Sequence, residues 1–179
     1  MSEIRRKLDI TELNRKTIDE FKESHKNKII VVLDNVRSQH NIGSVFRTCD
    51  AFLVEAIYLC GICSTPPNKE IHKSALGAED TVNWKYFEKT EDAIADLLSH
   101  NYIPFAIEQT ERSISLDELA TEKHKPYALV FGNEVHGISQ SVIDLCHLSL
   151  EIPQFGTKHS FNISVCAGIV LWEFYKQLS

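Results

Sequence analysis

The chain has 179 residues, of which 43% are hydrophobic and 25% are charged, and it carries a net charge of −6 with a pI near 5.7. This length suits one domain with a substantial core and is too short for two ordinary domains. The acidic balance argues against a surface that coats nucleic acid broadly. No run approaches the roughly 18 apolar residues of a membrane-spanning helix. The first residues lack the apolar segment of a secretory signal, so we expect a cytoplasmic protein.

Residues 1–27 are polar, and we expect them to form a helical extension of the main domain. Their apolar residues make a stripe too narrow to build a core, so the extension would dock on a surface. Basic residues crowd the stretch: Arg5, Arg6, Lys7, Arg15, Lys16, Lys22, Lys26 and Lys28. They form a candidate local basic patch, and a solvated helix face with acidic neighbours is an equally open interpretation.

The middle of the chain alternates apolar runs with amphipathic stretches. Residues 29–33 are typical of a strand buried on both faces, and further strands are predicted at 56–60, at the sheet edge over 82–87, and at 103–107. Helices are predicted from Asn41, a good N-cap residue, and over 69–76 and 91–99. Residues 111–126 are polar and indicate a loop with one helical turn at 116–119.

The last quarter contains two apolar runs, 128–131 and 148–152, that each end in a polar loop with glycine. Short apolar runs bounded by such loops predict buried strands, and residues 165–175 predict a helix after the second loop. Gly132, Gly137 and Gly156 alone would indicate only turns. The polar residues beside them favour a site instead: Glu134, His136, Ser160, Asn162 and Ser164. Ligands of open α/β sheets bind beyond the carboxyl ends of strands, so these loops are the first candidate site.

The alternation of strands and helices predicts a single α/β domain over residues 28–179 with a mainly parallel sheet of five or six strands. The loop after the first strand, DNVRSQHNIGS, holds one glycine, which excludes a GxGxxG dinucleotide site. The chain also lacks a GxSxG nucleophile elbow and a GxxxxGK[ST] phosphate loop.

Five cysteines without an export signal indicate free thiols. Cys60 and Cys63 form a CxxC, but no second pair of ligands has the spacing of a zinc site, and we expect no metal. A redox pair would stand at the start of a helix, and Pro66 and Pro67 oppose a helix there. An enzyme with thiol chemistry at this pair nevertheless stays open as an alternative.

Three segments together resemble a known family: NVRSQHNIGSVFRTCDAF (35–52), LVFGNEVHGIS (129–139) and IPQFGTKHSFNISVCAGIVLWEF (152–174). Their sequence and order closely resemble the three motifs of the SpoU (TrmH-type) RNA ribose methyltransferases of the SPOUT superfamily, and the resemblance covers residues 28–177. It implies methyl transfer from S-adenosylmethionine to a ribose 2′-hydroxyl of tRNA or rRNA. It also implies a homodimer and a domain whose residues 127–179 form a deep trefoil knot, a rare exception to unknotted chains.

The resemblance carries functional residues onto this chain. The catalytic set that it implies is Arg47, Asn41, Ser160, Asn162 and Glu134. The expected cofactor-binding set, which offers mainly backbone groups and close approach to adenine, is Ile107, Gly132, Asn133, Gly137, Ile152 and Phe161. Phe161 stands where family members usually have leucine, a change that would reshape the adenine pocket and leaves the assignment intact.

Chemistry limits what Arg47 can do, because a guanidinium keeps its proton at neutral pH. We therefore expect Arg47 to stabilise the developing alkoxide and hold the adjacent phosphate, which itself could take the proton. Asn41, Ser160 and Asn162 would fix that geometry. Glu134 is a candidate for proton handling or for ordering its loop.

The expected partners are RNA, with tRNA favoured over rRNA, and a second copy of the chain. The predicted RNA-binding residues are Arg5, Arg6, Arg15, Lys16 and Arg37, gathered near Arg47. The predicted dimer contacts come from the last helix, at Ala167, Gly168, Leu171, Trp172 and Tyr175. A homologue that binds RNA or S-adenosylmethionine without catalysis is the alternative.

Overall fold

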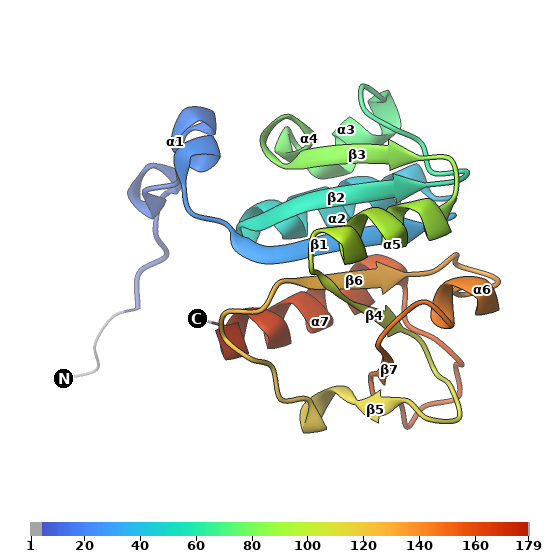
Figure 1. Ribbon diagram of the computed structural model, residues 1–179. Helices are drawn as coiled ribbons and strands as arrows, with labels where there is room; N and C mark the ends of the chain where they lie inside the picture. Colours follow the sequence, from blue (N-terminus) through green and yellow to red (C-terminus); the bar gives the residue numbers. More distant parts are fainter. Residues whose placement is uncertain (1–4, 179) are drawn as a thin grey trace.

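The computed structural model describes residues 5–178 and contains one seven-stranded sheet in the order β3-β2-β1-β6-β4-β7-β5 (Figure 1). All paired strands are parallel. The strands are β1 (Asn27–Asp34), β2 (Val54–Cys60), β3 (Asn83–Phe87), β4 (Ile103–Ile107), β5 (Ile114–Ser115), β6 (Tyr127–Phe131) and β7 (Leu148–Glu151). The single α/β domain with a parallel sheet is confirmed. The predicted count of five or six strands was wrong. The segment 111–126, which was predicted to be a loop, contains the additional short strand β5, and β5 pairs with β7.

The helices and short 3₁₀ turns are η1 (Ile10–Leu13), α1 (Ile18–Glu23), α2 (Gln39–Ala51), α3 (Lys69–Ala75), α4 (Ala78–Thr81), α5 (Thr90–Ser99), η2 (Leu116–Glu118), α6 (Gln140–Ile143) and α7 (Ile163–Leu178). The helices expected at 69–76, 91–99 and 165–175 are present, whereas the two four-residue helices α4 and α6 were not predicted. Within residues 5–178, no helix is both long enough and apolar enough to cross a bilayer.

Helices cover both faces of the sheet, which explains why β1 is apolar without interruption. Ile29, Val31 and Leu33 face the core made with α2, α3 and α7. Ile30 and Val32 point to the opposite face and pack in the smaller core made with α5 and α6. Successive side chains of a strand alternate between faces, so a strand with helices on both sides needs apolar residues at every position.

Helix α2 begins two residues before the Asn41 start that the sequence predicted. Its N-cap is Ser38, whose hydroxyl accepts a hydrogen bond from the Asn41 N–H at 3.2 Å. Serine and asparagine cap helices equally well, so local preference did not distinguish the two positions. Because Ser38 caps the helix, the Asn41 side chain is available for contacts elsewhere.

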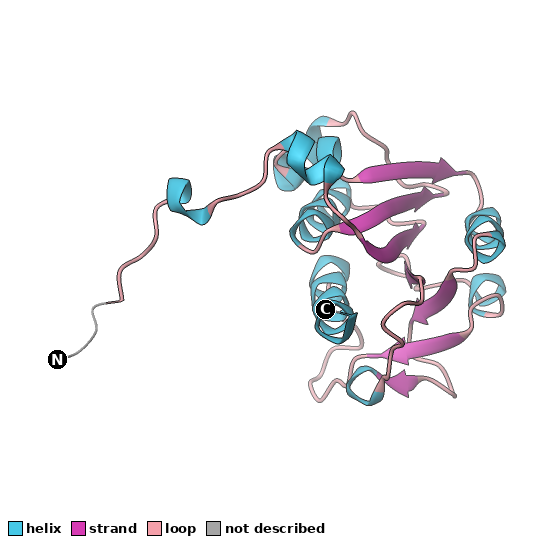
Figure 2. Cartoon of the chain, turned by 60° about the vertical axis from the view of Figure 1, so that its left-hand side comes forward, coloured by secondary structure: helices cyan, strands magenta, loops and turns pink. Residues whose placement is uncertain are grey.

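The N-terminal extension is joined to the body mainly through α1 (Figure 2). Phe21 is buried in the core, while residues 5–20 are exposed. Figure 2 shows the segment before α1 projecting away from the sheet. Residues 1–4 of the predicted extension, and residue 179 of the predicted domain and knot, lie outside the described part of the chain.

The sheet order brings four loops together at one end of the molecule. Strands β1, β6, β4 and β7 are neighbours and parallel, so the loops that follow Asp34, Phe131, Ile107 and Glu151 all leave from the same edge. Helix α7 starts just after the last of these loops and packs beside α2. The candidate site is at this edge.

Candidate active site at the carboxyl ends of the strands

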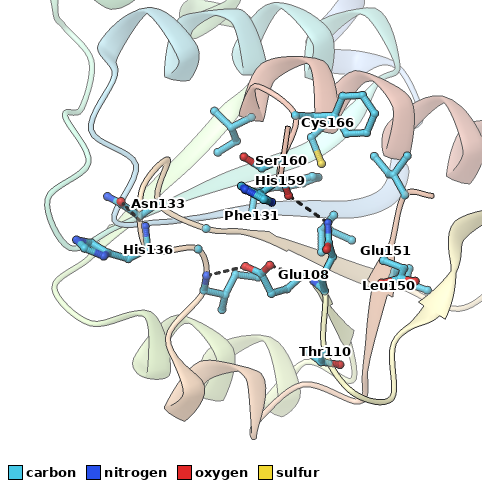
Figure 3. A pocket seen from close by; sticks show the side chains of 18 of the residues that line it. Glu108, Thr110, Phe131, Asn133, His136, Leu150, Glu151, His159, Ser160 and Cys166 are labelled. Atoms are coloured by element: carbon cyan, nitrogen blue, oxygen red, sulfur yellow. Dashed lines mark hydrogen bonds between the residues drawn. The ribbon is translucent and has the colours of Figure 1, made fainter. Parts of the chain in front are cut away.

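A cavity of about 1160 Å³ opens between the loops after β4, β6 and β7 (Figure 3). All six residues of the expected cofactor-binding set line it: Ile107, Gly132, Asn133, Gly137, Ile152 and Phe161. Three of the expected catalytic residues line it as well: Glu134, Ser160 and Asn162. Residues as distant in the sequence as Ile107 and Asn162 thus converge on one cavity, as the parallel sheet requires.

Glu134 joins the loop after β6 to the start of α2. Its Oε2 accepts a hydrogen bond from the Arg37 N–H at 3.0 Å, and its Oε1 accepts bonds from the Ser38 N–H at 2.9 Å and the Asn41 Nδ2 at 3.0 Å. Ser38 is the N-cap of α2 and Arg37 precedes it, and the N–H groups at the start of a helix have no partner within the helix. The Glu134 carboxylate therefore satisfies backbone donors that would otherwise need water.

These contacts also set the ionisation of Glu134. Partial burial acts to raise its pKa, but the hydrogen bonds from the Arg37 and Ser38 N–H groups oppose burial, and the pKa lies below its usual value. The group is therefore a carboxylate at neutral pH, and three donors already bind its oxygens. This arrangement suits a role in ordering the loops better than a role in accepting a proton.

Asn41 connects this pair of loops to the third motif. The Asn162 Nδ2 donates a hydrogen bond to the Asn41 Oδ1 at 3.2 Å. The Asn162 Oδ1 in turn accepts bonds from the Ser164 N–H at 2.9 Å and from the Ser164 hydroxyl at 2.6 Å, at the start of α7. The starts of α2 and α7 are thereby held together by side chains from all three motifs.

The turn after β6 is compact because of its glycines. Asn133 and Gly137 exchange two backbone hydrogen bonds, at 3.0 and 2.9 Å. A Cβ on Gly132 would lie 2.2 Å from the Gly137 carbonyl carbon, and Gly137 itself has a φ of +67°. The first position needs glycine for space and the second needs it for backbone conformation.

Glu108, which the three motifs do not contain, also lines the cavity. It directly follows β4, and its carboxylate accepts hydrogen bonds from the Gln109 and Ile138 N–H groups. The sequence feature that could have identified Glu108 is its place at the end of a strand, directly after the expected Ile107. The loop after β7 is held to this region through the Gln109 Nε2, which donates to the His159 carbonyl oxygen at 3.3 Å.

Comparison with known proteins identifies the family. Residues 28–172 match the SpoU rRNA Methylase family. The chain belongs to this family. A tRNA (guanosine(18)-2′-O)-methyltransferase of Aquifex aeolicus is 30% identical over 171 residues, which make up 94% of this chain and 78% of that protein. An enzyme of the same description from Thermus thermophilus is 27% identical, over 93% of this chain and 84% of its own length.

Solved structures of this family share the fold. The A. aeolicus TrmH/SpoU tRNA modifying enzyme has a TM-score of 0.79 and 27% identity, covering 89% of this chain and 80% of its own. An AdoMet-bound rRNA methyltransferase from Sinorhizobium meliloti has the same TM-score and identity, covering 89% of this chain and 60% of its own. Membership in the SpoU family confirms the enzyme class expected from the motifs, an S-adenosylmethionine-dependent RNA (ribose-2′-O)-methyltransferase.

The cavity of this SpoU family member fits S-adenosylmethionine. Its volume of about 1160 Å³ exceeds the range of roughly 300–1,000 Å³ for small-molecule pockets, which leaves room beside the donor for part of a nucleotide. Phe131, Ile152 and Phe161 offer apolar walls, while Glu108, Glu111, Glu134 and Glu151 give the lining more negative than positive charge. A donor with a positive sulfonium suits such a lining.

Arg47 does not line the cavity of its own chain. Its side chain is exposed, and its Cα lies six residues beyond Asn41, or about 9 Å along the axis of α2 at about 1.5 Å per residue. Asn41 is buried and also lies outside the cavity lining. Its side chain is hydrogen-bonded to two residues of the lining, Glu134 and Asn162.

Of the predicted RNA-binding residues, one lies next to α2 and the others lie in the N-terminal extension. Arg37 is exposed just before α2. Lys16 is exposed in the N-terminal extension. Arg6 is exposed and paired with Glu12 at 2.7 Å. Arg5 and Arg15 are exposed too.

The cysteines are all free thiols, as expected. Burial raises the pKa of Cys60 to about 12 and that of Cys63 to about 11, which opposes formation of a reactive thiolate. The Cys63 Sγ is hydrogen-bonded to the Val36 N–H and the Leu33 carbonyl, and thus packs as part of the β1 loop. Residues 5–178 contain no cluster of three metal-ligating side chains.

Proposed function

We propose that this SpoU enzyme methylates the ribose 2′-hydroxyl of a structured RNA, with tRNA favoured over rRNA. The observation that carries the proposal is the chain of hydrogen bonds from Glu134 through Asn41 to Asn162, which joins all three motifs beside one cavity. The A. aeolicus and T. thermophilus relatives named for tRNA support the preference for tRNA.

Some residues of the cavity would bind the methyl donor, and others would orient the ribose that accepts the methyl group. S-adenosylmethionine supplies an electrophilic methyl group on a sulfonium leaving group. Backbone groups of Ile107, Gly132 and Ile152 would hold adenine at the strand ends, where no side chain of Gly132 obstructs approach. Ser160 and Asn162, at the other wall, would orient the ribose by hydrogen bonds.

Glu134 and Asn41 are proposed as positioning residues. The Glu134 carboxylate is held by donors from Arg37, Ser38 and Asn41, so it would fix the start of α2 relative to the cavity. Asn41 would in turn hold Asn162 in position through the hydrogen bond between their side chains. The alternative role of Glu134 in proton handling has less support, because its lowered pKa makes it a weak base.

Arg47 is proposed to stabilise the developing alkoxide and hold the adjacent phosphate, as a guanidinium can do without giving up a proton. Since it is exposed and does not line its own cavity, we propose that it acts in the cavity of a second copy within a homodimer. The side-by-side packing of α2 and α7 supports this arrangement, because it places α2 next to the helix proposed for the interface.

The proposed dimer interface is a stripe on α7 made by Val165, Ile169 and Trp172, which are 51%, 37% and 50% exposed. These positions are four and three residues apart and therefore share one face of the helix. The expectation that Ala167 and Leu171 contact the partner was wrong, because both side chains are fully buried in the core of their own chain.

Several further features belong to the same proposal. We retain residues 1–27 as an RNA-binding extension, residues 28–179 as the catalytic domain and a deep trefoil knot over 127–179, supported by membership in the SpoU family. The five predicted basic residues would supply phosphate contacts on an otherwise acidic protein. Methylation of tRNA or rRNA would fit a cytoplasmic location.

The catalytic proposal is favoured over an inactive homologue because every expected catalytic residue is present and three of them line the cavity. Nucleoside mass spectrometry of tRNA and rRNA from cells with and without the gene tests it directly. A 2′-O-methylnucleoside that disappears from one RNA upon deletion is the expected result. An unchanged set of 2′-O-methylnucleosides in both RNAs would contradict the proposal.

The role of Arg47 has its own test. The Arg47→Ala variant should lose nearly all methyl transfer and still bind S-adenosylmethionine. When Arg47→Ala is co-expressed with a variant defective only in cofactor binding, one site per mixed dimer is intact if Arg47 acts across the interface, and about a quarter of wild-type activity returns. Absence of recovery in verified mixed dimers would show that Arg47 acts within its own chain.

A further inference from the structure

Glu108 is one of the cavity residues that lie outside the three motifs. It follows β4 directly and is half-buried. Figure 3 shows its carboxylate between the loop after β4 and the turn after β6, facing the cavity. Partial removal of a carboxylate from water costs free energy that hydrogen bonds must offset. The hydrogen-bond partners of Glu108 therefore bear on its role.

The carboxylate is held from two sides. Its Oε2 accepts a hydrogen bond from the Ile138 N–H at 3.1 Å, and its Oε1 accepts one from the Gln109 N–H at 3.0 Å. It also packs directly on Gly137, where an added Cβ would lie 2.3 Å from Oε2. The position of both oxygens is thus determined by the backbone of two loops, which is the preorganisation that a binding group requires.

The two N–H donors leave acceptor capacity on each oxygen. A carboxylate has about four lone-pair sites, two on each oxygen, and each oxygen of Glu108 uses one for a backbone N–H. Two adjacent acceptors remain, which match two adjacent hydroxyl donors. In dinucleotide-binding folds, a carboxylate likewise binds a ribose hydroxyl of the nucleotide.

We propose that Glu108 binds the 2′- and 3′-hydroxyls of the ribose in S-adenosylmethionine. The inference rests on the proposed function, because it requires the donor in this cavity. Ile107 precedes Glu108 and Gly137 lies against it, and both belong to the set expected around adenine, so the ribose attached to adenine is within reach.

The other carboxylates of the cavity are less suited to the diol. Glu134 already accepts hydrogen bonds from Arg37, Ser38 and Asn41. Glu151 accepts its hydrogen bond from the Ser113 side chain, at 2.9 Å, and not from backbone N–H groups, so its carboxylate is less firmly positioned than that of Glu108. Glu111 is exposed, three residues further along the same loop as Glu108. Glu111 is therefore a matched control for removal of one negative charge from the lining.

The test is calorimetric binding of S-adenosylhomocysteine and of its 2′-deoxy and 3′-deoxy analogues. Wild-type protein should bind the parent compound about tenfold to a hundredfold more tightly than either analogue, as expected for a hydrogen bond to a charged group. Glu108→Gln should weaken binding of the parent by a larger factor than binding of either analogue, because each analogue has only one of the two hydroxyls to lose from Glu108, so that the difference shrinks. Glu111→Gln should keep the difference.

Two outcomes would overturn the role of Glu108. One is equal binding of the parent and deoxy compounds by the wild-type protein, a result that needs no variant. The other is equal weakening of all three compounds by Glu108→Gln, which would make the residue a brace of the loop. Glu108→Asp keeps the negative charge but moves it further from the ribose, because the side chain is shorter, and should also reduce the difference. This variant covers the case in which Glu108→Gln fails to fold. Wild-type protein that binds none of the compounds would instead contradict the proposed function.

Discussion

The side-chain amide of Asn162 donates a hydrogen bond to the side-chain oxygen of Asn41, across 121 residues of sequence and 3.2 Å of space. The other end of the Asn41 amide donates to Glu134. Asn41 is buried, so both ends of its amide need partners, and each partner comes from a different motif. The geometry of the candidate active site therefore depends on one buried amide.

We predict that Asn41 and Asn162 act as a unit. Asn41→Ala and Asn162→Ala should each reduce methyl transfer strongly, and the double variant should lose less than the sum of the two, with a coupling of about 0.5–3 kcal/mol for side chains in contact. Initial rates with S-adenosylmethionine and bulk tRNA measure this. Asn83→Ala, at an exposed position of the edge strand, is the control and should behave as wild type. Strict additivity would show that the hydrogen bond carries no coupling.

Glu134 should make the order of the loops dependent on pH. Its pKa is lowered in the folded chain, so its stabilising effect is present above the usual carboxylate pKa and is lost as the pH falls through the lowered value. Glu134→Gln should reduce the melting temperature at pH 7, and the difference from wild type should shrink as the pH falls below the usual carboxylate pKa and vanish below the lowered pKa of the folded chain. A difference that persists unchanged at low pH would mean that charge is irrelevant to the contact.

Substitution by alanine should have a large effect at Gly132 and no effect at Gly156. A Cβ on Gly132 would lie 2.2 Å and 2.4 Å from backbone atoms of Gly137 and Ile138, so Gly132→Ala should destabilise the chain by about 1–3 kcal/mol and weaken cofactor binding. Gly156 has no atom within 4 Å of such a Cβ, and Gly156→Ala should change neither property. Chemical denaturation and calorimetry distinguish the two variants.

Trp172 should control assembly. It is half exposed, on the same face of α7 as Val165 and Ile169, so Trp172→Glu should shift a homodimer to monomer in sedimentation velocity. Leu98→Glu, which places the same charge at a comparably exposed apolar position on α5, should leave the dimer intact. Dimers that survive Trp172→Glu would show that the interface is elsewhere.

The sequence by itself determined the family and every strand except β5, and it located the loops whose residues line the cavity. Buried parallel strands are continuous apolar runs, so β1 and β6 could be located without tertiary information. The glycine-containing loops after β6 and β7 carry most of the motif residues, and their place at strand ends already predicted that they would meet.

Only the tertiary structure decided which of several equivalent residues takes which partner. Ser38 and Asn41 are equal as N-caps, and contacts with Glu134 and Asn162 decide that Asn41 binds across the site. Strand β5 is two residues long and exists because β7 offers it a free edge. The apolar residues of α7 give no local sign of which are buried. Packing against the sheet decides this, because burial, unlike strand propensity, depends on residues distant in the sequence.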